Sequence, residues 1–404
     1  MLQPEPAVPS ETSIPTYGAL DLGSNSFHLI VAGESGGRLK VLDKHREAVR
    51  LARGLDATDR ISQESIKTAL SALRRMAERI KNVQRSHLRV VGTNTLRKAE
   101  NSEAFIRQAE DVLGHRIEII GGREEARLIF LGVSHSIENR HSRRIVIDIG
   151  GGSTELILGQ HFQPRFMESL DIGCVSMTDR WFSSGLIKLS RFNNAINDAG
   201  SEIETVEHPF TKHRWDVAIG ASGTILAAQQ AMSKQLGMPV VTLEGLMHVK
   251  REMLQAGHVR ELPASLASVD RAAVFPGGIA ILIALFERLQ IEEMSVSDSA
   301  LREGIVHDIL GRVQDQDIRE KSVVELMARY HVDEIHAERV AHTAILLLDQ
   351  VSSSWDVGDE EDRAHLRWAG MLHEIGLDIS HASYHKHGAY LLEHLDIPGF
   401  SREE

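Results

Sequence analysis

Cysteine and aromatic residues are scarce in this chain: of its 404 residues one is cysteine, Cys174, and 5% are aromatic. A single thiol excludes any intramolecular disulfide framework and is typical of proteins in a reducing compartment. No histidine or cation that could activate Cys174 is adjacent to it, so we expect a buried packing residue. No apolar run reaches the ~18 residues of a membrane-spanning helix. Residues 1–15 lack the regions of a signal peptide and are predicted to form a disordered arm of a cytoplasmic protein, at most peripheral to the inner membrane.

Positive charge is also scarce, because 45 lysine and arginine residues stand against 57 aspartate and glutamate residues and give a net charge of −12. Nucleic-acid backbones are held by basic surfaces, so general nucleic-acid binding is not expected. A polyanionic substrate is still compatible with this balance, because it needs only a local basic lining and a metal ion. The hydrophobic share of 42% and the charged share of 25% are typical of globular proteins.

Strand-like and helical patterns alternate from the arm onward. The strand-like runs include GALDLG, FHLIVAGE and LRVVGTNTLR, and residues 62–83 form a helix with apolar side chains every three or four positions. The design restarts at Ile145 with IVIDIGGGSTELIL and continues with DVAIGASGTILAA. We predict two similar α/β domains, residues 16–138 and 139–313, with a helix at residues 123–137 at their junction.

From residue 314 the pattern becomes helical only, and histidines become frequent. We therefore predict a third, all-helical domain over residues 314–404, which the length of the chain allows. The segment ends at PGFSREE without a closing helix signal, so this domain is either small or cut short.

Each α/β segment begins with a strand that ends in an aspartate followed by a glycine-containing turn. A buried carboxylate is costly unless a positive group pairs with it, and a turn of glycines lets backbone N–H groups converge on phosphate oxygens. One such turn is typical of a capped hairpin, whereas two at corresponding places favour a metal ion beside a phosphate chain. The predicted phosphate-binding residues are Gly23, Ser24, Asn25 and Ser26 in the first turn and Gly150, Gly151, Gly152, Ser153 and Thr154 in the second.

The acids of these turns are the predicted metal ligands. Asp21 ends the first strand, Asp148 ends the second, and Glu155 lies just beyond the second turn. Mg²⁺ is expected because it commonly takes one or two carboxylates together with waters and substrate phosphates. Mn²⁺ suits the same oxygen ligands. Glu155 is equally compatible with an indirect role or with a solvated turn.

The motifs resemble those of a known family. GALDLGSNSFHLIV, VIDIGGGSTEL and AIGASGT are similar to the two phosphate motifs and the third glycine motif of the actin, sugar-kinase and chaperone ATPase superfamily. More narrowly, LDLGSNSFHL, GTNTLR, REEARLI, DIGGGSTEL and ALREG resemble the exopolyphosphatase / guanosine-pentaphosphate phosphohydrolase (Ppx/GppA) family from Tyr17 onward. The resemblance implies two actin-like (ribonuclease H-like) ATPase-type α/β domains around a cleft and a C-terminal, all-α HD-like domain.

The same resemblance implies hydrolysis of terminal phosphoryl groups by water, with a glutamate of the REEARLI motif as the general base. The match favours Glu125 over Glu124. Adjacent residues on a helix point about 100° apart, so only one of the two can face a cleft. The other acid is explained by the favourable field at a helix N-terminus.

Further phosphate-binding residues are implied by the motif matches. Thr93, Asn94 and Arg97 of TNTLRKA come after a strand, and arginine suits phosphate through its paired N–H donors. Arg271 in SVDRAAVFPGG is carried over in the same way, and Gly223 belongs to AIGASGT, which shapes the cleft. A surface ion pair is the other interpretation of both arginines.

The histidine-rich segment resembles the HD-type domain that extends long family members. His336 and His373 fall at places expected for its H…HD…D signature, but Glu374 replaces the aspartate and the closing aspartate has no evident counterpart. Glutamate moves the carboxylate oxygens outward by one methylene, which would spoil a dinuclear site. We therefore predict a degenerate domain that extends the substrate channel or the interface of a homodimer.

Three functions are open at this stage. The main prediction is a metal-dependent exopolyphosphatase that removes terminal phosphate from inorganic polyphosphate, because in the nucleotide-specific relatives alanine often replaces the third glycine, Gly152. The alternative is a 5′-phosphohydrolase of guanosine pentaphosphate, which acts in the stringent response. The third is a nucleotide-binding sensor without turnover, which Glu125 disfavours because a pure binder needs no base.

Overall fold

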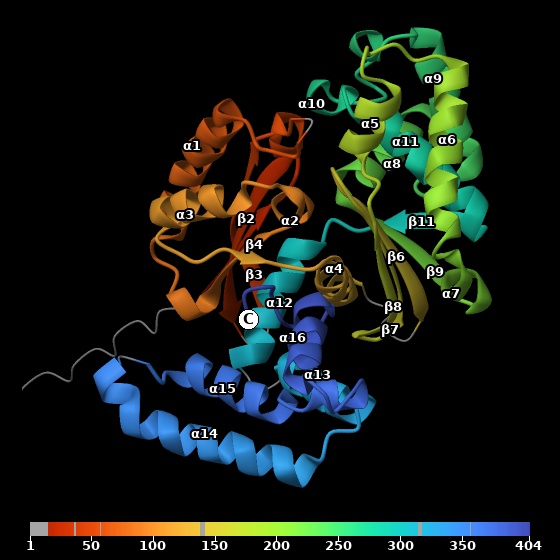
Figure 1. Cartoon of the computed structure of the whole chain (residues 1–404). Coiled ribbons are helices and arrows are strands. Elements are labelled where there is room, and N and C mark those ends of the chain that lie inside the picture. The colour runs from red at the N-terminus through yellow and green to blue at the C-terminus, as the bar shows by residue number, and fades with distance from the viewer. Residues whose placement is uncertain (1–14, 36–37, 57, 138–141, 314–316, 356) are drawn as a thin grey trace, which may run out of the picture.

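The computed structural model describes residues 15–404 except 36–37, 57, 138–141, 314–316 and 356 (Figure 1). The predicted disordered arm lies outside these residues, apart from its last one. The described chain forms two α/β halves and a third, helical part that is packed below them in the view of Figure 1.

A five-stranded sheet with the order β3-β2-β1-β4-β5 forms the first half. β1, β2 and β3 are antiparallel neighbours, whereas β4 and β5 run parallel to β1. α1 and α3 cover one face of this sheet, and the apolar positions predicted for the helix at residues 62–83 are all buried there. The elements are β1 (Thr16–Leu22), β2 (Ser26–Ser35), β3 (Arg38–Ala48), η1 (Leu51–Gly54), α1 (Gln63–Ile80), η2 (Arg85–His87), β4 (Leu88–Gly92), α2 (Asn94–Lys98), α3 (Ser102–Leu113) and β5 (Glu118–Ile119).

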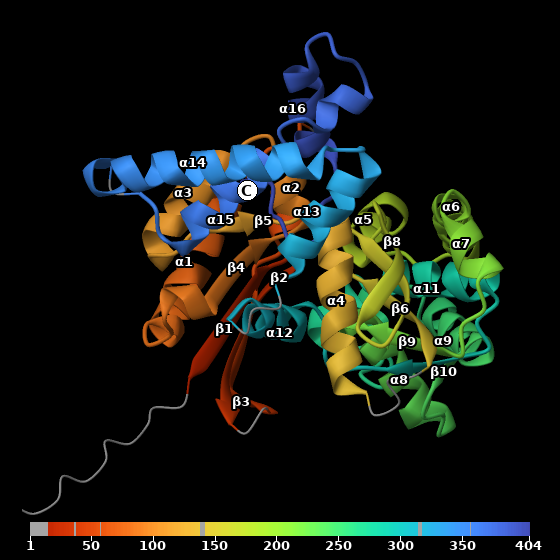
Figure 2. The same ribbon diagram turned by 90° about the horizontal axis from the view of Figure 1, so that it is seen from below.

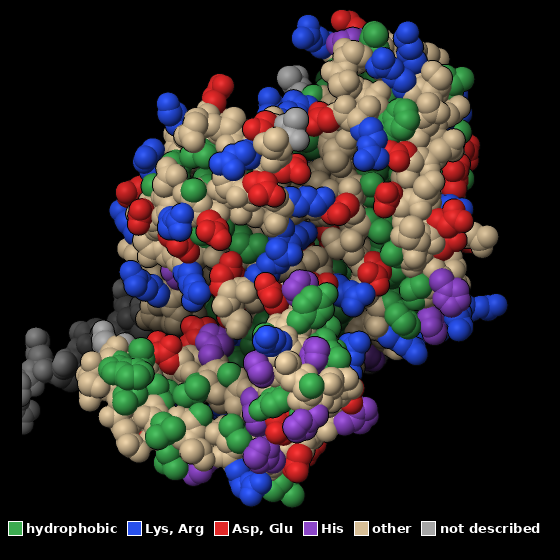
Figure 3. All heavy atoms as spheres, in the orientation of Figure 1, with side chains coloured by type: hydrophobic (Ala, Val, Ile, Leu, Met, Phe, Trp, Pro, Cys, Tyr) green, Lys and Arg blue, Asp and Glu red, His purple; other side chains and the backbone are tan. Residues whose placement is uncertain are grey.

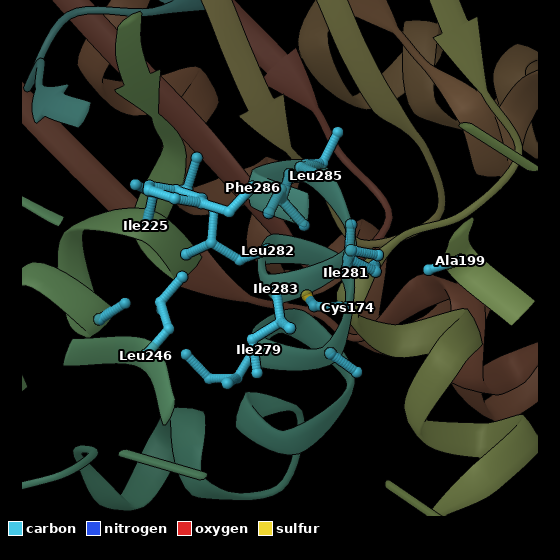
Figure 4. Close-up of a cluster of buried hydrophobic side chains, with 14 of the residues drawn as sticks. Cys174, Ala199, Ile225, Leu246, Ile279, Ile281, Leu282, Ile283, Leu285 and Phe286 are labelled. Atoms are coloured by element: carbon cyan, nitrogen blue, oxygen red, sulfur yellow. The ribbon is translucent and has the colours of Figure 1, made fainter. Parts of the chain in front are cut away.

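A six-stranded sheet with the order β10-β11-β9-β6-β7-β8 forms the second half. Helix α11 is buried along most of its length, and its apolar side chains form the centre of this core together with Cys174 (Figure 4). The predicted burial of Cys174 is confirmed. The elements are β6 (Arg143–Ile149), β7 (Thr154–Gln160), β8 (Gln163–Leu170), α5 (Cys174–Trp181), α6 (Leu189–Glu204), α7 (Glu207–Lys212), β9 (Val217–Ala221), α8 (Ser222–Leu236), β10 (Val241–Thr242), α9 (Leu243–Ala256), η3 (Val259–Glu261), α10 (Val269–Ala272), α11 (Phe275–Leu289) and β11 (Glu293–Val296).

The two halves repeat one design, as the sequence predicted. β1 and β2 form an antiparallel hairpin with β4 parallel to β1, and β6 and β7 form the same hairpin with β9 parallel to β6. The acids occupy matching positions: Asp21 lies opposite His28 in the first hairpin, and Asp148 lies opposite Glu155 in the second. Both aspartates are therefore the next-to-last residue of the first strand of a hairpin, close to its turn.

Two helices form a layer between the sheets. α4 (Gly122–Ser136) packs on β7 and β8, α12 (Leu301–Val313) packs on β1, and the two helices contact each other (Figure 2). A Cβ at Gly132 would lie 2.1 Å from the carbonyl oxygen of Ala300, the residue before α12, and one at Gly304 would lie 1.8 Å from that of Leu128 in α4. The two glycines therefore allow this contact. α4 falls within the predicted first domain, residues 16–138, but packs on the second sheet. α12 falls within the predicted second domain, residues 139–313, but packs on the first sheet. These limits stay predictions.

The third part of the chain is helical, as predicted. Its small core contains Val323, Leu326, Trp368, Met371 and Ile375, which come from two helices and a 3₁₀ turn. In the described residues no helix is both long and apolar enough to cross a membrane. The elements are α13 (Ile318–Arg329), α14 (Glu334–Trp355), α15 (Glu360–Leu372), η4 (Ile375–Asp378) and α16 (Tyr384–His394).

Candidate active site

The two glycine turns face each other across one cavity. A Cβ placed at Gly151 would lie 3.1 Å from the Cβ of Ser24, and one placed at Gly152 would lie 2.4 Å from Oδ1 of Asn94. The second turn can therefore approach the first only because it carries no side chains there. The cavity between the turns has a volume of about 400 Å³, and both Asp21 and Asp148 line it.

In each turn a carbonyl oxygen is held by a backbone N–H group from outside the turn. Asn25 O accepts a hydrogen bond from Arg50 N (2.8 Å), and Gly150 O accepts one from Cys174 N (2.9 Å). A carbonyl oxygen that already accepts a hydrogen bond repels a nearby anion less than a free one. The turns are therefore suited to phosphate, whose oxygens are held by N–H groups and cations.

Most of the predicted site residues line this cavity. They comprise the catalytic candidate, the three acids and most of the phosphate-binding set: Asp21, Gly23, Ser24, Asn25, Ser26, Thr93, Glu125, Asp148, Gly150, Gly151, Gly152, Ser153, Glu155, Gly223 and Arg271. The structure thus brings together residues that lie up to 250 positions apart in the chain, although their individual roles stay predictions.

Three predicted phosphate-binding residues have other positions and are absent from the cavity lining. The hydroxyl of Thr154 donates to the carbonyl of Ile172 (2.6 Å) and is fully buried. Asn94 is buried against Gly152. Arg97 donates to Oε2 of Glu125 (3.1 Å) and to the carbonyl of Ile120 (2.7 Å). In this structure Arg97 therefore contacts the predicted base and not the cavity.

Sequence reasoning missed part of the basic lining, which includes Lys44, Arg46 and Arg302. Arg46 donates to the hydroxyl of Ser26 in the first turn (3.1 Å). Arg302 belongs to the ALREG motif, a signal that could have predicted it, whereas Lys44 and Arg46 stand in an ordinary charged strand. His28 also lines the cavity, and burial together with Arg302 and Arg46 lowers its pKa to about 3, so it is neutral.

The acids of the cavity are buried without enough positive partners. Burial and the charge of Glu125 raise the pKa of Asp21 to about 8 and that of Asp148 to about 7. Burial also raises the pKa of Glu155, which accepts a hydrogen bond from Ser169 (2.8 Å). Oδ1 of Asp21 is buried and has no hydrogen-bond partner among the described residues. Such a group is stabilised by a cation.

The donor set fits a hard divalent ion such as Mg²⁺, because all its atoms are carboxylate oxygens. The three acids do not form a closed cluster of the kind whose ligand atoms all lie within 4.8 Å of one another in the described residues. An ion held by Asp21 and Asp148 would therefore take its other ligands from water and phosphate. When bound, it would neutralise charge on the phosphate oxygens.

Glu125 enters the cavity from the first turn of α4. It is buried, and burial raises its pKa while Arg97 opposes the increase. A carboxylate with a raised pKa is a better base for water than an ordinary one. The neighbouring Glu124 points elsewhere and pairs with Arg127. The prediction that only one of the two acids faces the cleft is confirmed.

Arg271 and Cys174 also line the cavity. A Cβ at Gly223 would lie only 1.5 Å from a guanidinium nitrogen of Arg271, so this glycine is needed for the arginine to reach the cavity. Burial raises the pKa of the Cys174 thiol, which is the opposite of what a nucleophile needs.

Comparison with known proteins now places the chain. A model of the Ppx/GppA phosphatase family matches residues 29–313, and a model of domain III of these phosphatases matches residues 318–404. The chain is 40% identical over 387 residues to a guanosine-5′-triphosphate,3′-diphosphate pyrophosphatase of Aeromonas hydrophila, covering 96% of this chain and 78% of that protein. It is 39% identical over 392 residues to the protein of the same name from Vibrio cholerae, covering 97% and 79%.

This chain belongs to the Ppx/GppA phosphatase family. As a member it is a hydrolase of phosphoric anhydride bonds. The family resemblance read from the motifs is thereby confirmed.

Solved structures of Ppx/GppA proteins have the same fold. An exopolyphosphatase from Cytophaga hutchinsonii is similar with a TM-score of 0.66 and 23% identity, over 73% of this chain and 97% of that one. The Aquifex aeolicus Ppx/GppA enzyme is similar with a TM-score of 0.61 and 24% identity, over 72% and 99%. The predicted fold class, two actin-like α/β domains with a helical C-terminal domain, is confirmed.

The helical part of this Ppx/GppA protein contains the histidines singled out in the sequence, and Figure 3 shows histidine side chains gathered over it. His336 and His373 lie beside Glu374, with Nε2–Oε1 distances of 3.7 and 3.8 Å. Arg339 donates to Nδ1 of His336 (3.2 Å), which places a positive charge next to this group. None of these residues lines the active-site cavity. The degeneracy of the domain stays a prediction.

Proposed function

We propose that this Ppx/GppA phosphatase hydrolyses guanosine pentaphosphate, guanosine 5′-triphosphate 3′-diphosphate, at its terminal 5′-phosphoryl group. One observation carries the choice of substrate: the relatives about 40% identical over nearly the whole chain are named for this nucleotide. Structures named exopolyphosphatase are less similar in sequence, at 23% identity for the Cytophaga protein. The products are guanosine tetraphosphate and inorganic phosphate.

Glu125 is the proposed general base. It takes a proton from a water molecule as the water oxygen attacks the terminal phosphorus and the bond to the bridging oxygen breaks. Arg97 holds the Glu125 carboxylate in place through a hydrogen bond of 3.1 Å. The N–H groups of the two turns bind the phosphoryl oxygens, and Asp21 and Asp148 hold the divalent cation that we propose, Mg²⁺ or Mn²⁺.

The cationic lining suits a substrate with two phosphate chains. Lys44, Arg46, Arg271 and Arg302 all line this cavity, where arginine and lysine side chains can bind phosphate oxygens once a divalent cation neutralises the acids. A nucleoside with a 5′-triphosphate and a 3′-diphosphate presents anions on both sides of its sugar. The lining is compatible with such a ligand.

The sequence pointed to polyphosphate through Gly152. A Cβ at this position would lie 2.4 Å from Oδ1 of Asn94, so in this chain the glycine also has a packing reason. Gly152 by itself therefore does not favour polyphosphate. A homodimer and a cytoplasmic location stay predictions from the sequence.

The test is to measure products from guanosine pentaphosphate and from long-chain polyphosphate with Mg²⁺ present. We expect kcat/KM for the nucleotide to be at least about 10-fold higher, and Glu125→Gln to lower kcat about 10²–10⁴-fold on both. Glu207→Gln is the matched control, because Glu207 is also a first-turn helix acid paired with an arginine but lies in α7. Faster hydrolysis of polyphosphate would overturn the substrate assignment, and an active Glu125→Gln would overturn the base.

A further inference from the structure

A network of buried ion pairs lies on the side of α4 that faces away from the cavity. Arg127 donates to both oxygens of Glu124 (2.7 and 2.8 Å) and to Oδ1 of Asp308 in α12 (2.5 Å). Asp308 also accepts from Arg89 (2.6 Å) and Arg312 (3.1 Å). All of these acids and arginines are nearly inaccessible to solvent except Arg312. The network therefore joins the first turn of α4 to α12 and to β4.

The helical domain reaches into the same network. The backbone N–H of Gly399 donates to Oε2 of Glu124 (2.8 Å), and the carbonyl of Gly399 accepts from Arg312 (2.9 Å). Next to it, the N–H of Arg402 donates to the carbonyl of Ile119 in β5 (3.0 Å). A carboxylate that accepts from a backbone N–H and a guanidinium forms strong, charge-assisted bonds. Glu124 thus connects α4 to the helical domain through a hydrogen bond.

The start of α4 depends on such external contacts. Gly121, the residue that caps the helix, has no side chain to bind the first N–H groups. A Cβ at Gly121 would lie 2.5 Å from Oδ1 of Asp396, and one at Gly122 would lie 2.5 Å from Cβ of Ser169. The first turn is therefore clamped between the helical domain on one side and β8 on the other.

We propose that Glu124 is a positioning residue through which the helical domain fixes Glu125 in the active site. The two glutamates are consecutive on one helical turn, so a shift of the Glu124 carboxylate moves Glu125 as well. A misplacement of about 1 Å of a catalytic group can cost roughly 10²-fold in rate. Removing one partner of a buried ion pair also costs stability, so the test needs a readout of position and controls for stability. The inference rests on the proposed role of Glu125.

Two variants disturb the contact between Glu124 and Gly399, one in α4 and one in the helical domain. Glu124→Gln replaces the charged carboxylate by a neutral amide, which accepts hydrogen bonds more weakly. Gly399→Ala displaces the loop of the helical domain, because φ is +92° and the new Cβ would lie 2.7 Å from Ile318 and 2.8 Å from Arg319. We expect each to lower kcat about 10-fold with KM changed less than about 2-fold, because neither touches the phosphate-binding turns. The double variant should lose little more than either single one.

Matched controls separate positioning from loss of stability. Gly358→Ala introduces the same strain at a positive φ (+106°) in the same domain, but Gly358 lies between α14 and α15, and the nearest atoms to its new Cβ belong to Ser352 and Leu348. Glu207→Gln removes an acid from a comparable arginine pair. Both should keep wild-type kcat.

Hydrogen exchange gives a readout that does not need activity. Peptides covering residues 121–130 should exchange faster in Glu124→Gln and Gly399→Ala than in wild type or in the two controls. Wild-type kcat and exchange in both variants would overturn the inference, and so would equal losses of kcat in the controls. Activity in Glu125→Gln would refute the proposed base, and the exchange experiment would still decide whether Glu124 links the helical domain to α4.

Discussion

Buried acids lie on both sides of α4, but they have enough partners on only one of them. On the Glu125 side, burial raises the pKa of Asp21 and Asp148, and Oδ1 of Asp21 has no partner among the described residues. On the Glu124 side, Arg127, Arg312 and Arg89 hold the pKa of Asp308 well below its usual range. Buried acids that lack partners mark a place for a ligand, whereas buried acids with every oxygen bound form scaffold.

The largest effect should come from replacing one acid on each side of α4 by its amide. Asp308→Asn leaves three arginines, two of them buried, without their shared acid, so we expect a loss of about 3–5 kcal/mol in the free energy of unfolding. Asp148→Asn removes an unpaired buried charge, so in the absence of metal we expect unchanged or higher stability. The same variant should lower kcat/KM about 100-fold or more.

Denaturant unfolding in chelator and phosphate release measure the two halves of this comparison. Asp216→Asn is the control for an exposed pair, because Asp216 binds Arg143 at the surface, and it should lose far less stability than Asp308→Asn. Equal losses of unfolding free energy in Asp308→Asn and Asp148→Asn would show that the acids on the two sides of α4 do not differ in this way.

The next effect concerns pH and metal removal. The pKa of Asp21 is about 8 and that of Asp148 about 7 in the folded chain, against an ordinary value of 3.8. Between these values the folded state holds protons that the unfolded chain has lost, so stability falls as pH rises. In chelator we expect Tm to drop between pH 5 and pH 8, and added Mg²⁺ to raise Tm more at pH 8. A Tm that rises with pH over this range would contradict the assignment.

The smallest effect is expected at Thr154, which the sequence placed in the phosphate cradle. Its hydroxyl donates to the carbonyl of Ile172 outside the cavity, so Thr154→Val should cost about 1 kcal/mol of stability. We expect kcat/KM within about 2-fold of wild type. Ser24→Ala is the companion variant, because Ser24 lines the cavity and its loss should affect KM. A large loss of activity in Thr154→Val would return this residue to the site.

Local sequence signals predicted much of the fold. The period of apolar residues at 62–83 matches α1 (Gln63–Ile80), and the repeated strand–turn–strand motif matches the β1/β2 and β6/β7 hairpins. These features depend on a few neighbouring residues, so they can be recognised without a structure. The packing of α4 and α12 on sheets of the other half could not be predicted, because it depends on a long-range match between Gly132 and Gly304.

The candidate site was predicted unevenly for a similar reason. Asp21, Asp148 and Glu125 stand in motifs with a chemical meaning of their own. Lys44 and Arg46 stand in a charged strand that has no such pattern, and only their neighbours in space show that they line the cavity. Arg97 was predicted to bind phosphate from its motif match and its residue type, and in the structure it donates to Glu125.

The sequence alone determined the kind of chemistry, because glycine turns behind strand-end acids suit a cation and phosphate wherever they meet. The motif match favoured Glu125 over Glu124, but only the tertiary structure showed that Glu125 faces that chemistry and that Glu124 contacts the helical domain. The physical reason is that helix geometry separates Glu124 and Glu125 by direction, while the partners that fix each direction, Gly399 and Arg97, are distant in the chain.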